Sequence, residues 1–95
     1  MQDITQYEDR AKRGLSEISE LMAQVRDPNF REKIISPSTH YFEDAQDGCR
    51  LWRESQYASW ASLVNLSLQM GESNLQQIRE YIKTYGGPEN IVAIG

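Results

Sequence analysis

The sequence predicts an all-α protein: an antiparallel hairpin of two long helices with two short helices, closing a four-helix bundle as a dimer. Two observations lead to this fold class. Apolar residues recur at intervals of three and four along most of the 95 residues. The middle of the chain is apolar on more of its circumference than one neighbouring helix covers. Helix-breaking residues then divide the chain into four segments, at Asp27-Pro28, Ser36-Pro37-Ser38, Gly71 and Gly86-Gly87-Pro88.

The composition fits a single domain over residues 1–95 with a thin core. Hydrophobic residues make up 39% of the chain, below the roughly 45–50% of typical domains, so pairing with another chain is one way to enlarge the core. The net charge of −4 argues against a general nucleic-acid binder, because phosphates attract basic surfaces. An acidic surface suits solubility or a basic protein partner.

Nothing in the chain indicates export or a membrane. Cys49 is the single cysteine, so no intramolecular disulfide can form. The first residues lack the basic and apolar regions of a signal peptide. The uncharged stretch 55–71 is interrupted by polar residues and is shorter than the ~20 apolar residues that a spanning helix needs. We therefore expect a cytoplasmic protein.

The first helix is expected from Ile4 to Arg26, with Asp3 as its N-cap and Gln6 completing a capping box. Gly14 lies in its apolar seam, where it either allows another helix to come close or is simply tolerated. The spacing of the seam is that of a heptad pattern. Its members are Ile4, Tyr7, Ala11, Gly14, Ile18, Leu21 and Val25.

The second helix is expected to be short. Asp27 is a suitable N-cap, and Pro28 fits the first helical position, where its missing N–H costs nothing. Ser36-Pro37 should stop this helix, because proline disfavours helical geometry in the residue before it.

The third helix is expected to be the centre of the protein, from Ser38 to Gly71, with Gly71 just past its end. A main seam and a second stripe run along it. Trp52 on the main seam is interpreted as intrachain core, whereas the second stripe is either a dimer interface or further intrachain core. The main seam is Phe42, Ala45, Cys49, Trp52, Gln56, Ser59, Leu63, Leu66 and Met70, and the second stripe is Tyr57, Trp60, Val64 and Leu68.

The fourth helix is expected from Asn74 to Tyr85, with Ser73 as its N-cap. Gly86-Gly87-Pro88 should end it. The apolar tail 91–94 is too short for an independent element, and we expect it to pack back as an extended arm or to add to a partner.

The sequence offers little catalytic chemistry. His40 and Cys49 are the candidates for a nucleophile and base, but on one helix they would lie on opposite faces, ~13.5 Å apart along the axis. Cys49 lies on the apolar seam, where a buried, inert thiol is usual. We expect no enzyme activity and no cofactor.

Four residues at helical spacing form a weak candidate metal site: His40, Glu43, Asp44 and Asp47. The simpler interpretation is that acidic side chains near a helix start interact with its dipole. A metal- or small-ligand-binding bundle and a nucleic-acid-associated regulator remain the alternative functions.

The aromatic residues of the third helix indicate a protein interface, because tryptophan, tyrosine and arginine are enriched at binding hot spots. Trp52 lies on the main seam, where core is favoured, whereas Tyr57 and Trp60 favour an interchain contact. We expect a small acidic adaptor or inhibitor, of the immunity or antiactivator type, that masks a protein partner and also forms a homodimer. The expected partner-binding residues are Trp52, Arg53, Tyr57, Trp60, Val64 and Leu68.

Overall fold

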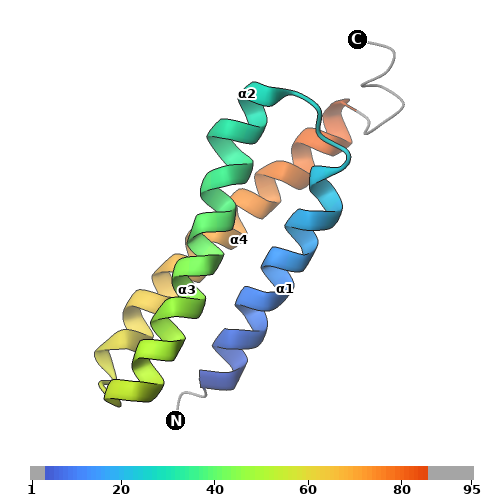
Figure 1. Cartoon of the computed structure of the whole chain (residues 1–95). Helices are drawn as coiled ribbons and strands as arrows, with labels where there is room; N and C mark the ends of the chain where they lie inside the picture. Colours follow the sequence, from blue (N-terminus) through green and yellow to red (C-terminus); the bar gives the residue numbers. More distant parts are fainter. Residues whose placement is uncertain (1–3, 86–95) are drawn as a thin grey trace.

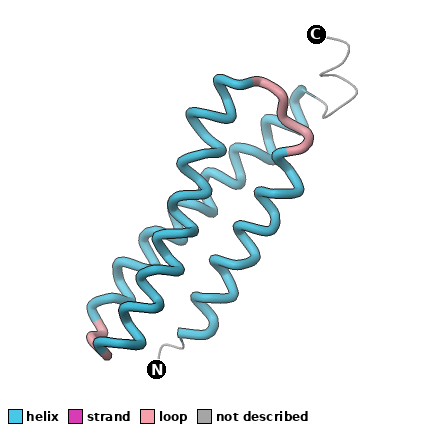
Figure 2. Tube along the Cα trace, in the orientation of Figure 1, coloured by secondary structure: helices cyan, strands magenta, loops and turns pink. Residues whose placement is uncertain are grey.

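The computed structural model describes residues 4–85, and over this range the chain is all-α, without strands. Three helices pack along one another into an elongated bundle (Figure 1). Figure 2 shows that the loops lie at the two ends of the bundle. The elements are α1 (Ile4–Met22), α2 (Pro28–Phe30), the π-helical turn η1 (Arg31–Ile35), α3 (Ser36–Ser55) and α4 (Ser59–Tyr85).

The first helix ends at Met22, four residues earlier than expected. Its last turn tightens, since the N–H groups of Gln24 and Val25 donate to the carbonyls of Leu21 and Met22. The guanidinium of Arg31 donates to the carbonyls of Met22 and Val25. The turn is therefore held by a side chain from the next helix, and Val25 is buried.

The second helix starts as predicted. The Asp27 carboxylate accepts hydrogen bonds from the N–H groups of Asn29 and Phe30, at 2.9 and 3.4 Å, and Pro28 occupies the first turn. These contacts satisfy N–H groups that have no partner within the helix.

The expected stop at Ser36-Pro37 is wrong. The helix continues from α2 through η1 into α3, and the Ser36 N–H donates to the Arg31 carbonyl, five residues back. A proline inside an α-helix clashes with the carbonyl four residues earlier. The wider π-helical turn directly before Pro37 shifts those carbonyls, so the helix absorbs the proline.

The expected helix from Ser38 to Gly71 is also wrong, because the chain reverses at residues 56–58. Gln56 adopts a left-handed conformation with φ of 64°, and its N–H donates to the Trp52 carbonyl at 2.7 Å. No glycine or proline marks this turn in the sequence. Past the turn, α4 is one helix to Tyr85, so Gly71 does not end a helix and Ser73 does not begin one.

Glycines allow the three helices to approach closely around Phe42, which is fully buried. A Cβ atom on Gly14 of α1 would lie 2.3 Å from the Phe42 ring, and one on Gly71 of α4 would lie 2.9 Å from it. A Cβ on Gly48 would lie 2.7 Å from Val64. Of the two interpretations of Gly14, the close approach is therefore the one observed.

The core runs through all three helices, so the predicted hairpin of two long and two short helices is replaced by a three-helix bundle. Val64 and Leu68 of the predicted second stripe are covered by their own chain, at 1% and 0% exposure. The other buried apolar residues include Ile18, Ile35, Ala45, Cys49, Trp52, Leu75 and Ile78. The predicted roles of Asp3 and of the tail 91–94 lie outside the described residues.

Candidate protein-interaction surface

Three large apolar side chains of α4 remain exposed to solvent. Leu63, Leu66 and Met70 are 54%, 56% and 44% exposed. Their spacing of three and four residues places them on one side of the helix, and we call this side the α4 outer face. Single exposed apolar residues are ordinary, whereas a contiguous group indicates a binding surface.

The α4 outer face points away from α1. Glu72 and Arg79 mark the side of α4 that faces α1, because they form ion pairs with Arg10 and Glu17. Leu63 is nine residues from Glu72, and Met70 is nine residues from Arg79. Nine steps of ~100° amount to two and a half turns, so these side chains leave α4 on the side opposite its ion pairs.

No charged residue lies on the chain from Ser55 to Gly71. On α4 itself, the neighbours of the outer face are therefore small or amide side chains without charge. These neighbours are Ser59, Ser62, Gln69 and Ser73, all exposed.

Acidic residues of α3 lie at the edge of this surface. The contacts Gly48–Val64 and Phe42–Gly71 set the antiparallel register of α3 and α4, which places Asp44 and Asp47 level with the α4 outer face. Asp44 is nine residues from Arg53, whose ion pair with Glu8 marks the α1 side of α3. Asp44 therefore lies on the opposite flank of α3, and both carboxylates are exposed.

The structure does not bring the predicted partner-binding residues together on one exposed face. Val64 and Leu68 are core, so they are not open to a partner. Trp52 is 8% exposed, and its ring lies 5.7 Å from that of Tyr7, which agrees with the core interpretation. Tyr57 is 68% exposed in the turn before α4, and Trp60 is half-buried.

Arg53 is engaged within the chain. Its guanidinium donates to both carboxylate oxygens of Glu8, at 2.6 and 2.9 Å, and to the Thr5 hydroxyl at 3.4 Å. It therefore holds α1 against α3.

The exposed and buried stripes of this region are exchanged relative to the prediction. The heptad register of Phe42, Cys49 and Trp52 predicts that Leu63, Leu66 and Met70 continue the same seam. The turn at 56–58 interrupts that register, so the orientation of α4 is set anew by its packing on α3. The sequence indicated that this region has more apolar surface than one neighbouring helix covers. It did not indicate which side of the helix would be left exposed.

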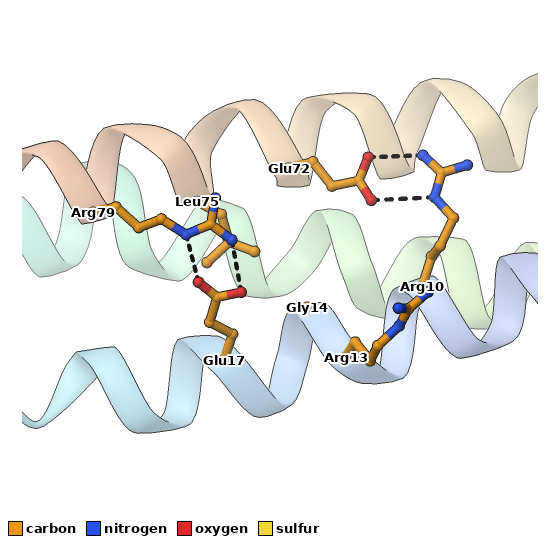
Figure 3. A pocket seen from close by; sticks show the side chains of 7 residues that line it. All are labelled: Arg10, Arg13, Gly14, Glu17, Glu72, Leu75 and Arg79. Atoms are coloured by element: carbon orange, nitrogen blue, oxygen red, sulfur yellow. Dashed lines mark hydrogen bonds and ion pairs between the residues drawn. The ribbon is translucent and has the colours of Figure 1, made fainter.

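A groove of about 380 Å³ between α1 and α4 is lined mainly by charged side chains. Figure 3 shows two ion pairs across it, Arg10–Glu72 and Glu17–Arg79. Both are bidentate, with distances of 2.6 to 3.1 Å. Hydrogen bonding from Arg79 lowers the pKa of the Glu17 carboxyl below its ordinary value. These four residues pair with one another and thereby fasten α1.

The predicted metal residues do not form a cluster. His40 and Glu43 approach to 3.5 Å, but the part of the chain that the structure describes holds no group of three or more His, Cys, Asp or Glu residues suited to a metal ion. Cys49 is buried, and its burial raises the pKa of the thiol, which disfavours a reactive thiolate. None of the helices within residues 4–85 is long and apolar enough to cross a membrane.

Comparison with known proteins leaves the chain without an assigned family: no protein-family model, no curated protein and no solved structure matched it.

Proposed function

We propose that this protein is a non-catalytic interaction module that binds a protein partner through the α4 outer face. The observation that carries this proposal is the exposure of Leu63, Leu66 and Met70 within an uncharged surface. An apolar stripe of this kind is the geometry by which a helix docks into a groove or packs against another helix.

The side chains at this surface suit protein contact. Leucine provides a rigid apolar knob, and methionine adapts to irregular partner surfaces because its side chain is unbranched and polarisable. Tyr57, exposed just before α4, extends the surface toward the amino end of the helix. The acidic edge at Asp44 and Asp47 keeps this face soluble while the partner is absent.

The action would be stoichiometric. By covering an apolar surface on its partner, an 11.0 kDa acidic chain would act as an adaptor or as an inhibitor, including the antiactivator type. A second copy of the chain is one such partner. Two α3–α4 hairpins meeting through these faces would form a four-helix bundle, although from other helices and residues than the dimer predicted from the sequence.

A photo-crosslinking experiment in the native cells tests the proposal. A benzoylphenylalanine residue replaces Leu66, and a matched variant carries the same residue in place of Ser19, which is exposed on α1. The expected result is a crosslink from position 66 to one protein species, a second copy included, and none from position 19.

The docking role is overturned if neither position captures a protein and the purified chain also stays monomeric at the highest soluble concentration. Equal capture at both positions would also contradict it, because a specific surface must favour position 66.

A further inference from the structure

We infer that the partner on the α4 outer face is the same face of a second copy, packed antiparallel about a twofold axis that passes beside Leu66. This inference rests on the proposed docking role and names its occupant. In a twofold contact the same surface is used by both copies, so the surface must be complementary to itself.

The order of side chains along α4 has this property. Toward the start of the helix, Leu66 is followed by the apolar Leu63 and then by Ser59. Toward its end, Leu66 is followed by the apolar Met70 and then by Ser73. In the antiparallel pairing Leu63 lies near Met70 of the second copy, and Ser59 lies near its Ser73. In a parallel pairing each residue would instead lie near the same residue of the second copy, for example Ser59 near Ser59. The twofold axis would then run along the helices and would not pass beside Leu66.

The charge distribution limits the faces on which two copies can meet. Two chains of net charge −4 repel each other, so they associate best where neither presents a charge. On α4 the positions facing outward from residue 59 to residue 77 carry no charge. They are Ser59, Leu63, Leu66, Met70, Ser73 and Gln77.

The size of the contact and its acidic edge make the dimer weak. Three apolar side chains per copy form a small interface, and interfaces below ~1,200 Å² are typical of transient complexes. Asp44 and Asp47 of both copies would add repulsion at the edge. Salt screens that repulsion, so added salt should strengthen the dimer, whereas it would weaken binding to a basic partner.

Light scattering of the purified full chain over a concentration series measures the association. The mass should rise from 11.0 kDa toward twice that value, and the midpoint should move to lower concentration in 0.5 M salt. Leu66→Glu should weaken the dimer at least about tenfold. Ser19→Glu, which adds the same charge on α1, should leave it within about twofold, as expected for a distant exposed site.

Cysteine crosslinking tests the geometry, since Cys49 is buried and does not compete. Under mild oxidation, Leu66→Cys should form a covalent dimer readily and Ser19→Cys should not. A mixture of Ser59→Cys and Ser73→Cys chains should give the mixed disulfide. Dominant Ser59–Ser59 crosslinks would overturn the antiparallel arrangement.

A chain that stays monomeric at high salt, with Leu66→Cys no more reactive than Ser19→Cys, overturns the second copy as occupant. If position 66 then still photo-crosslinks to a different protein in cells, the docking role stands and only self-pairing fails. If it captures nothing, both proposals fail.

Discussion

The interface between α3 and α4 and the attachment of α1 share close glycine contacts, but they differ in their charged contacts. Across α3 and α4, glycines and large apolar side chains meet without intervening space, as at Phe42–Gly71 and Gly48–Val64. Gly14 of α1 likewise lies against Phe42, and α1 also buries Ala11 and Ile18, but bidentate ion pairs fasten this helix in addition. These pairs are Glu8–Arg53, Arg10–Glu72 and Glu17–Arg79.

This difference separates two tasks. Close packing fixes the register of the α3–α4 hairpin, because a one-residue shift would place glycine positions against the wrong side chains. Partly exposed ion pairs contribute little stability each, but they determine which side of α1 faces the hairpin. The hairpin is therefore the rigid part that presents the α4 outer face, and α1 covers its opposite side.

The largest effect is expected from a pair of identical substitutions on α4. Leu68→Ala removes a fully buried side chain and should lower the free energy of unfolding by about 3 kcal/mol. Leu66→Ala, two residues away and 56% exposed, should change it by less than about 0.5 kcal/mol. Urea denaturation at low protein concentration measures both. The reverse order would mean that the buried and exposed stripes of α4 are wrongly assigned.

A methyl group at Gly14 tests the point where α1 meets the hairpin core. Its Cβ would lie 2.3 Å from the Phe42 ring, so Gly14→Ala should cost about 2 kcal/mol despite the better helix propensity of alanine. In a chain that already carries Phe42→Leu, Gly14→Ala should lower the free energy of unfolding by less, because the smaller side chain leaves room for the methyl group. Chemical denaturation of the two single variants and the double variant measures this coupling. Simple additivity of the two costs would argue against direct contact.

The turn of the hairpin should be open to stabilisation. Gln56 holds a left-handed conformation that costs an L-residue ~1–2 kcal/mol, and glycine adopts it freely. Gln56→Gly should raise the free energy of unfolding by about 0.5–1 kcal/mol, after the extra entropy of glycine in the unfolded chain. Thermal unfolding of this variant is compared with that of Ser55→Gly. Ser55 is the last residue of α3 and its hydroxyl accepts from the Tyr57 N–H, so this second substitution should be destabilising.

The smallest effect is expected at the α1–α4 groove. A double-mutant cycle with Glu17→Gln and Arg79→Gln should give a coupling of about 0.5 kcal/mol, and this coupling should fall in high salt. Because the folded-state pKa of Glu17 is lowered, the contribution is present above the unfolded pKa of ~4.3. It is lost as pH falls through the lower folded-state value. A coupling that persists at pH 2 would contradict this origin.

Helical periodicity and capping residues were sufficient to predict the all-α class and the capped turn at Asp27-Pro28. Gln56 shows why the main turn was hard to predict: residues 55–58 contain no glycine, proline, asparagine or aspartate. The one local turn signal is Ser55, whose hydroxyl accepts a hydrogen bond from the Tyr57 N–H at 3.3 Å, and packing of α4 back on α3 offsets the strain at Gln56. Pro37 shows the opposite error, because a strong breaker was absorbed by a π-helical turn.

The sequence by itself determined that the middle of the chain carries more apolar surface than one helical neighbour can cover, since spacing and composition are local properties. Only the tertiary structure decided which stripe is buried. That choice depends on where the chain reverses, and once it reverses at Gln56, the close fit of Gly71 to Phe42 and of Gly48 to Val64 turns Val64 and Leu68 inward and leaves Leu63, Leu66 and Met70 facing solvent.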